Sequence, residues 1–360
     1  IISRNNMEMC SSYMNWKQGV SNEETFRHYN NLMKSFLRFH KESNPDNLID
    51  LDILKLKEML EEFVVREKAR GVGRGMIKGI INAVDSFLQN NDVYIETRRV
   101  KKWLPAKQKT RNHIPYTTEQ LQEILDCLKS KSSFRLRVAS HILCASGARV
   151  GFAKYLKVKH IGEYEKYGCK SILIYGDEVD EYYSFIHQEA VEILDQWLEY
   201  RKSQGEIITG ESWVIPSSKD HTKKSPRNDI TAKLIDRCHS VDRGVKVNGR
   251  YDTAIMHGMR KRWDTVAKDN DNANYNKIEK MFAHNTKTHS LDTVYNKPKL
   301  PALFVEYDKF YRGLYISDSF RLRIELDQKD MIIEASQSQK DDTIKDLMDR
   351  IALLEKFIKV

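Results

Sequence analysis

The sequence lacks paired cysteines, a long apolar run and a secretory signal pattern. Its five cysteines are scattered without a CxxC pair, which argues against a disulfide framework and against a thiolate metal site. They are Cys10, Cys127, Cys144, Cys169 and Cys238. No stretch approaches the roughly 18 apolar residues of a membrane span. We therefore expect a cytoplasmic protein in a reducing compartment, without a membrane partner. Because the chain begins at Ile1 rather than Met, we also expect a short piece before it.

Charge of one sign is in excess. The 360 residues include 60 Lys and Arg against 51 Asp and Glu, a net charge of +9. Such an excess favours a polyanionic partner and steers association with it. The hydrophobic share of 40% and the charged share of 31% are typical of a soluble globular chain with two or three domains.

Helical spacing dominates the first part of the chain. Ser21 to Glu24 has the spacing of a capping box, and apolar residues follow at helical intervals from Phe26 to Phe39. Further helices are predicted over 51–70 and 76–89, on either side of a glycine-containing loop. The sequence predicts an all-helical N-terminal domain within residues 1–96.

A basic segment follows this helical unit. It carries seven basic residues and no acid, and Pro105 interrupts any helix. Like charges at this density repel one another unless an anion neutralises them. We predict an interdomain linker over residues 97–114 that follows DNA phosphates; a solvated surface segment is the alternative. The seven residues are Arg98, Arg99, Lys101, Lys102, Lys107, Lys109 and Arg111.

The rest of the chain predicts a mainly α second domain over 115–300 with a small antiparallel sheet. A capping signal at Thr117 opens a helix, and an apolar segment ends at Arg149. Residues 170–175 and 182–186 alternate as a β-hairpin. Helices are predicted over 190–200, 230–238, 256–268 and 275–283.

Residues 301–360 predict a C-terminal helical tail. Five apolar residues near its end are spaced 3, 4, 3 and 4 apart, as in the seam of a short coiled coil. This seam packs either against the protein's own body or against another subunit. It consists of Ile344, Leu347, Ile351, Leu354 and Ile358.

Five polar residues carry the candidate chemistry. Arg149 follows the apolar segment, and His257 and Arg260 are spaced to share one helix face. His284 lies in "MFAHN" and Tyr295 in "DTVYNKP". Taken singly, each is more simply explained as a packing residue or an ion-pair partner.

In order and separation, these five residues resemble the catalytic domain of tyrosine recombinases, the phage-integrase family. "SGARVGFAKYLKVKHI" resembles the first arginine box of the family and "HGMRKRW" the second. "KMFAHN" is similar to the Leu-Gly-His element, and Tyr295 stands where the nucleophile is expected. The resemblance covers roughly residues 115–296, and residues 20–112 more loosely resemble the core-binding domain.

The resemblance implies a site-specific recombinase that cuts and rejoins double-stranded DNA without metal, ATP or another cofactor. Arg149 and Arg260 would brace the negative charge that gathers on the phosphate under attack. His257 would accept a proton or bind the phosphate, and His284 would donate a hydrogen bond to it. Tyr295 would attack phosphorus and form a 3′-phosphotyrosyl link. The implied partners are a specific DNA site and further copies of the chain, a dimer on one site and a tetramer in synapsis.

The match departs from the family in the hairpin turn, where the family usually places a lysine that protonates the departing 5′ oxygen. Here Gly176 to Glu181 contains four acids and no lysine, so we expect this turn to lie away from DNA or to fold differently. Lys170, Lys166 or a lysine of the loop 219–224 are alternatives. Phe152 also replaces an acid of the first arginine box.

A third departure is the step of eleven residues from His284 to Tyr295, slightly longer than is typical. It would let the tyrosine swing or reach a neighbouring subunit. Two other functions stay open, a type IB topoisomerase-like enzyme and a catalytically inactive DNA-binding relative. A metal-dependent nuclease is disfavoured, because no carboxylate cluster has metal-ligand spacing.

Overall fold

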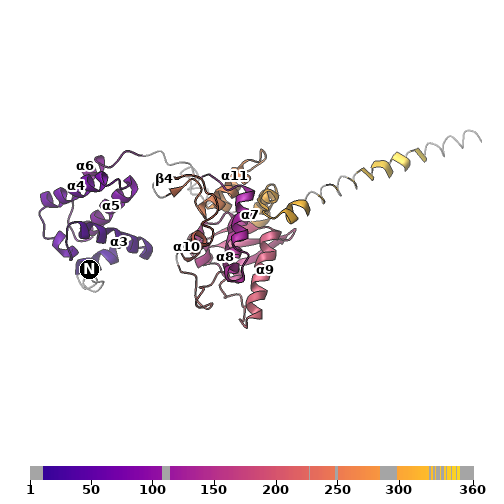
Figure 1. The fold of residues 1–360 in the computed structure, drawn as a ribbon, viewed down its shortest axis with the longest axis horizontal. Helices are drawn as coiled ribbons and strands as arrows, with labels where there is room; N and C mark the ends of the chain where they lie inside the picture. Colours follow the sequence, from indigo (N-terminus) through magenta and orange to yellow (C-terminus); the bar gives the residue numbers. More distant parts are fainter. Residues whose placement is uncertain are drawn as a thin grey trace, which may run out of the picture. The chain divides into compact units, whose positions relative to one another are not determined.

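The computed structural model divides the chain into two units, residues 1–110 and 111–360. It describes residues 11–107, 114–226, 228–247, 250–283 and 298–323, and separate positions between 326 and 348. Figure 1 draws the first unit in indigo and purple, and the second from magenta to yellow. No helix in these described ranges is long and apolar enough to cross a membrane.

The first unit is helical, as predicted. Asn22, rather than Ser21 of the predicted capping box, caps helix α3 (Glu23–Phe39) by accepting hydrogen bonds from the backbone N–H groups of Glu24 and Thr25. The apolar faces of the helices enclose a core in which Trp16 and Phe87 are fully buried. The helices are α2 (Ser11–Gly19), α3 (Glu23–Phe39), α4 (Ile53–Ala69), α5 (Arg74–Gln89) and α6 (Arg98–Lys102), with a 3-10 turn η1 (Pro45–Leu48).

Helix α6 lies in the segment that the sequence analysis assigned to the linker. Val100 lies within α6, and Leu104 follows Trp103, the C-cap residue of this helix. Both are buried in the core of the first unit, with exposed fractions of 1% and 5%. In the sequence, basic residues on both sides of Val100 obscure the apolar pattern that would indicate a buried segment. The start of the basic segment is thus a packed part of the first unit.

The second unit is built around helix α8 (Phe134–Ser146). Every residue of this helix except Arg137 is buried, and it contacts α9, α10, α11 and strand β3. Its neighbours along the chain are α7 (Thr118–Cys127), which begins with the predicted capping box at Thr117, and the 3-10 turns η2 (Lys131–Ser133), η3 (Val150–Lys154) and η4 (Val158–His160). The later helices are α9 (Gln188–Ser203), α10 (Asp229–Arg237), α11 (His257–Lys268), α12 (Tyr275–Phe282) and α14 (Leu300–Asp308), followed by η5 (Tyr311–Leu314).

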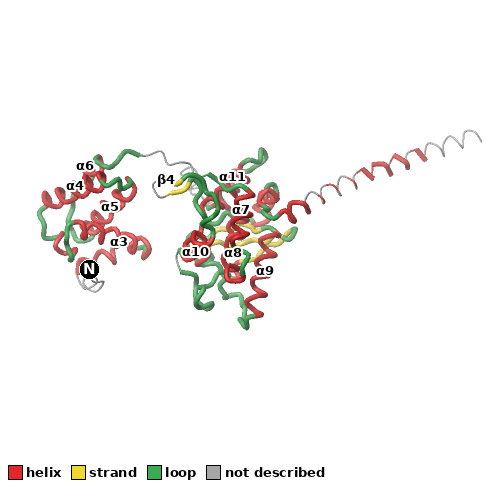
Figure 2. The backbone as a smooth tube through the Cα atoms, viewed as in Figure 1, coloured by secondary structure: helices red, strands yellow, loops and turns green. Residues whose placement is uncertain are grey.

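A three-stranded antiparallel sheet packs against helices α8, α9, α12 and α14 (Figure 2). Its order is β1 (Ile161–Lys166), β2 (Cys169–Ile174), β3 (Tyr182–Ile186), and a two-stranded ribbon is formed by β4 (Lys246–Val247) and β5 (Arg250–Tyr251). The predicted fold class, mainly α with a small antiparallel sheet, is confirmed. Strand β1 was not predicted, because its sequence IGEYEK is polar and none of its residues is fully buried.

The C-terminal end of α8 is fixed by three other elements. The carbonyl of Ala145 accepts hydrogen bonds from the indole N–H of Trp263 in α11 (3.0 Å) and from the hydroxyl of Tyr307 in α14 (2.9 Å). The carbonyl of Ser146 accepts a hydrogen bond from Ser184 in β3 (2.7 Å). Because the last carbonyls of a helix have no partner within it, these contacts anchor the end of α8 in one position.

The predicted tail begins at residue 301, but α14 and η5 pack in a core of the second unit, and the residues that follow them are tied to α9. The backbone N–H groups of Ile316 and Ser317 both donate to the carboxylate of Glu189, at 2.9 Å each. Farther along the predicted seam, Ile344 and Leu347 are about half exposed, at 50% and 51%. The other seam positions, Ile351, Leu354 and Ile358, lie outside the described residues.

Replacing Gly147, the residue after α8, should destabilise the fold. Its φ is 63°, and a methyl group there would lie 2.6 Å from the ring of Trp263. We expect Gly147→Ala to lose about 1–2 kcal/mol from the left-handed backbone and about 1 kcal/mol or more from the clash. Urea unfolding of the full chain, followed by near-UV circular dichroism, measures the loss.

Gly205→Ala is the matched control for this substitution. Gly205 has a φ of 87°, but an added methyl group would meet no atom within 4 Å. It should therefore show only the backbone cost. Equal losses in the two variants would contradict the described packing of Gly147 against Trp263.

Candidate active site

Arg149 is positioned by the abrupt end of helix α8. The backbone N–H of Gly147 donates to the carbonyl of Leu143 (2.9 Å), and the positive φ of Gly147 turns the chain out of the helix. Ala148 remains buried, whereas Arg149 is exposed and directly precedes η3 as its N-cap residue. The apolar segment thus ends by presenting a guanidinium at the surface, from a backbone that packing holds in place.

Arg260 reaches the same place from helix α11. It is only 5% exposed, and its guanidinium donates hydrogen bonds to the carbonyls of Gly147 and Phe282. The guanidinium carbon lies 3.5 Å from the centre of the Phe282 ring. Burial lowers the pKa of Arg260, and the nearby charge of Arg149 lowers it further. Carbonyls at the ends of α8 and α12 therefore orient this cation.

The two arginines meet at the end of helix α12. Arg149 donates to the carbonyl of Ala283 (2.6 Å), next to the carbonyl of Phe282 that accepts from Arg260. Helix C-termini carry partial negative charge, which favours cations there. Neither arginine makes an ion pair with a carboxylate in the described ranges. Two positive charges without a partnered acid form a site suited to an anion such as a phosphate.

His257 lies one helical turn before Arg260. It is the first residue of α11 and is exposed. The next residue, Gly258, fixes the start of the helix, because a methyl group there would lie 2.6 Å from Thr253 and 2.8 Å from Tyr116. The i, i+3 spacing places His257 and Arg260 on the same side of α11.

His284 and Tyr295 both lie outside the described residues. Ala283, the residue before His284, accepts the hydrogen bond from Arg149. The structure thus brings together Arg149, Arg260 and the chain position that directly precedes His284. The roles of His284 and Tyr295 stay predictions.

Two tyrosines that the sequence analysis did not single out lie beside the arginines. Tyr175 follows β2 and Tyr182 begins β3, so they stand at the two ends of the hairpin turn. Burial raises the pKa of both hydroxyls, and the charges of Arg149 and Arg260 act in the opposite direction with a smaller effect. In sequence, tyrosines next to a hairpin turn are simply good strand formers, which is why they gave no signal.

The acidic turn between these tyrosines is tied down by basic side chains. Asp177 pairs with Lys159 (3.2 Å) and lies 3.4 Å from His160 Nε2. His160 Nδ1 accepts the backbone N–H of Lys157 (3.2 Å), so the neutral ring carries its proton on Nε2, facing Asp177. Lys159 in turn holds the pKa of Asp177 below its usual range. One of the four turn acids is therefore neutralised within the protein.

Two of the lysines considered as substitutes for the turn lysine lie at the other end of the sheet. Lys170 is close to the start of β2, 3.6 Å from Glu165, and Lys166 lies over the ring of Tyr167 at 4.8 Å. Lys170 and Tyr175 are five residues apart, about 17 Å at the rise of a strand. Neither lysine can therefore serve the phosphate site at the arginines.

Phe152 occupies the position where the family pattern has an acid. It is fully buried in the core of the second unit, packed in the 3-10 turn that follows Arg149. A carboxylate there would be desolvated without a partner, at considerable cost. Support for Arg149 comes instead from the carbonyl of Ala283.

Part of the basic segment is neutralised internally. Arg99 lies 3.5 Å from Glu61, and Lys101 lies 3.8 Å from Asp85. Glu61 and Asp85 are distant from the basic segment in the sequence, so these ion pairs could not be predicted from it. Fewer than seven of these charges therefore need an external anion.

Three described residues of the basic segment remain for an external partner. Arg98, Lys102 and Lys107 are exposed and make no ion pair within the described part of the chain. Lys109 and Arg111 lie outside it. The three exposed cations are the candidates for contacts with DNA phosphates.

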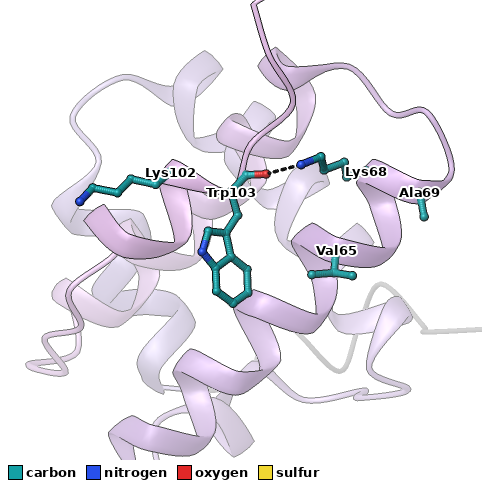
Figure 3. A pocket seen from close by; sticks show the side chains of 5 residues that line it. All are labelled: Val65, Lys68, Ala69, Lys102 and Trp103. Carbon is teal, nitrogen blue, oxygen red and sulfur yellow. Dashed lines mark hydrogen bonds between the residues drawn. The ribbon is translucent and has the colours of Figure 1, made fainter.

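An open pocket of about 610 Å³ lies beside this segment in the first unit (Figure 3). It is lined by Val65, Lys68 and Ala69 of α4 and by Lys102 and Trp103. Figure 3 shows the Lys68 amine directed at the Trp103 carbonyl, a hydrogen bond of 3.4 Å. Its lining offers an indole and two amines but no carboxylate. This pocket suits binding rather than catalysis.

The described residues contain no group of three His, Cys, Asp or Glu side chains that could hold a metal ion. No protein-family model matches the sequence, and no curated protein matches it significantly.

The structure matches solved tyrosine recombinases over most of the chain. One is a lambda integrase dimer bound to a COC′ core site, with a TM-score of 0.52 and 16% identity over 79% of this chain and 92% of that chain. Another is the Tn1549 transposon integrase in complex with transposon right end DNA, with a TM-score of 0.52 and 16% identity over 83% of this chain and 99% of that chain. At these identities the likeness establishes a shared fold.

The two arginines should differ in their importance for stability. Arg260→Met leaves two buried carbonyls without their donor, which should cost about 1–3 kcal/mol of unfolding free energy. Arg149→Met should cost about 1 kcal/mol or less, because Arg149 is exposed and its carbonyl partner can bind water. Urea unfolding of both variants measures the difference. A loss at Arg149 as large as that at Arg260 would contradict this assignment.

Proposed function

We propose that the protein is a site-specific DNA recombinase of the tyrosine type. It cuts and rejoins double-stranded DNA in the cytoplasm through a 3′-phosphotyrosyl intermediate, without metal or ATP. The observation that carries the proposal is the convergence of Arg149 and Arg260, both unpaired with described acids, at the end of α12. The shared fold with the lambda and Tn1549 integrases supports it.

The arginines stabilise the transition state of phosphoryl transfer. A phosphodiester under attack gathers negative charge on its non-bridging oxygens, and two guanidinium groups can donate forked hydrogen bonds to them. Anchoring by helix-end carbonyls limits the freedom of Arg260 before the substrate arrives. Loss of either arginine should lower the cleavage rate by about 10²-fold or more.

The remaining roles follow from the chemistry of the side chains. Tyr295 attacks phosphorus, and His257 accepts its proton or binds the phosphate, since imidazole can do either near neutral pH. His284 donates a hydrogen bond to the phosphate. The phosphotyrosyl bond keeps the energy of the broken ester, so a strand can be resealed to a new partner without ATP.

Recombination needs several copies of the chain. We propose a dimer on one DNA site and a tetramer when two sites pair. The C-terminal tail offers half-exposed apolar residues, among them Ile344 and Leu347, that could contribute to association. A type IB topoisomerase-like enzyme would instead act as a monomer on any supercoiled DNA.

The second candidate is a DNA-binding relative that has lost catalysis. The turn between Tyr175 and Tyr182 favours it, because it contains acids but no lysine. Covalent capture on DNA separates the two functions.

Wild-type protein incubated with sheared DNA from the region around its gene should yield adducts that survive SDS. Sequencing should place them at discrete sites, each with a free 5′-hydroxyl end. Tyr295→Phe should form no adduct while binding the same DNA, because it lacks the nucleophile. Tyr94→Phe, at an exposed tyrosine of the first unit, is the matched control and should behave as wild type.

Adducts at wild-type yield from Tyr295→Phe would contradict the role of this residue. Site-specific binding by wild-type protein with no adduct at any site would favour the inactive relative.

Binding to DNA should weaken steeply with salt, because phosphate contacts release counterions. On a duplex of arbitrary sequence, combined replacement of Arg98, Lys102 and Lys107 by alanine should reduce the slope of log K against log salt by about 3. Lys101→Ala should change it by less than about 1, because Lys101 is paired with Asp85. Fluorescence anisotropy between about 50 and 200 mM salt measures the slopes. An unchanged slope in the triple variant would remove these residues from the interface.

A further inference from the structure

Cleavage by the proposed mechanism expels a 5′ alkoxide from phosphorus. An alkoxide is a poor leaving group unless it receives a proton as the bond breaks, and a positioned general acid contributes about 10²–10⁴-fold to such a step. The donor must be a protonated group close to the phosphate that Arg149 and Arg260 hold. The hairpin turn contains no lysine that could supply this proton.

Tyr175 is held at this site by an unusual backbone. Its φ is 56°, a left-handed value that bulky residues rarely adopt, so the surrounding structure must impose it. A methyl group on Gly151 would lie 2.7 Å from the Tyr175 hydroxyl, so the glycine leaves the space that the hydroxyl occupies. Gly151 is only two residues after Arg149. This places the phenol oxygen beside the backbone that carries the first arginine.

Neighbouring rings fix the orientation of this phenol. Tyr155 packs edge-on against Tyr175 with ring centres 5.4 Å apart, and Tyr182 lies 6.2 Å away on the other strand. The turn that follows is pinned through Asp177 to Lys159. The hydroxyl of Tyr175 is therefore presented from a rigid hairpin end.

The electrostatic setting suits a neutral proton donor. Burial raises the pKa of Tyr175 to about 12, which keeps the phenol protonated at neutral pH. The charges of Arg149 and Arg260 act in the opposite direction and stabilise the phenolate left after transfer. A phenol of this kind can give up its proton only when a strong base, such as a departing alkoxide, forms beside it.

Tyr182 has a different position. Its hydroxyl is buried with no hydrogen-bond partner of good geometry among the described residues, and it lies beside the guanidinium of Arg260. A hydroxyl sealed from solvent cannot reach a DNA oxygen. Tyr182 is therefore a positioning residue that packs against Arg260.

We infer that the Tyr175 hydroxyl donates the proton to the leaving 5′ oxygen, in the place of a lysine; the inference rests on the proposed function. As the bond from Tyr295 to phosphorus forms and the bond from phosphorus to the 5′ oxygen breaks, the proton of Tyr175 moves to that oxygen. His257 takes the proton of Tyr295. During religation the 5′-hydroxyl returns its proton to the Tyr175 phenolate, and that of Tyr295 is restored.

A substrate with sulfur at the 5′ bridging position tests this assignment. A thiolate leaves without help from an acid, because a thiol has a far lower pKa than an alcohol. On a nicked DNA substrate with the natural oxygen at this position, Tyr175→Phe should cleave about 10²-fold or more slower than wild type. It should cleave the sulfur substrate within about threefold of the wild-type rate. A purely structural role would slow both substrates alike.

Two further variants serve as comparisons. Tyr182→Phe should slow both substrates by the same factor, because it acts through Arg260. Lys154 is one rival donor, since its amine lies 5.0 Å from the ring of Tyr155, which packs on Tyr175. Lys154→Met should retain cleavage of the normal substrate. Near-UV circular dichroism confirms that each variant is folded.

The outcomes separate this inference from the proposed function. If wild type cleaves both substrates and Tyr175→Phe is equally impaired on both or on neither, only the inference fails. The same holds if Lys154→Met is impaired on oxygen and rescued by sulfur. If wild type cleaves neither substrate at a site it binds specifically, the proposed function fails and the inference with it.

Discussion

The second unit depends on how the carbonyl groups at the end of helix α8 are capped. Trp263 and Tyr307 bind the carbonyl of Ala145, and Arg260 binds that of Gly147. These donors come from α11 and α14, both far from α8 in the sequence, so the end of α8 joins the three helices. The same contact that satisfies the helix also places a guanidinium beside Arg149. Stability and candidate chemistry thus share one set of hydrogen bonds.

The consequence is a cationic site that needs no acid to hold it. Carboxylates would orient the arginines but would also neutralise them and repel a phosphate. Helix-end carbonyls orient them while carrying only partial charge. The carbonyls of Phe282 and Ala283 add the end of α12 to this arrangement and bring the chain up to His284. A phosphate entering the site would meet two guanidinium groups that these carbonyls already hold in place.

Local signals in the sequence predicted the elements that carry strong periodicity or caps. The apolar stripe from Phe26 to Phe39 and the capping box at Thr117 correspond to α3 and α7. Helix α6 and strand β1 were missed, because basic residues flank the buried Val100 of α6 and the sequence of β1 is mostly polar. Both elements form because of tertiary packing, which a local sequence pattern does not reveal.

The site was partly predictable for a similar reason. Arg149 and Arg260 could be recognised in the sequence, because Arg149 follows an apolar segment and Arg260 lies near the start of a helical pattern. Tyr175 and Tyr182 gave no such signal, because only the fold brings them close to Arg260. The most direct test of the account is a crystal structure of the protein trapped on a nicked DNA duplex. We expect phosphorus bonded to the Tyr295 oxygen, with both guanidinium groups within hydrogen-bond distance of its oxygens. A phosphate bound elsewhere, with Arg149 and Arg260 still donating only to the helix-end carbonyls, would contradict it.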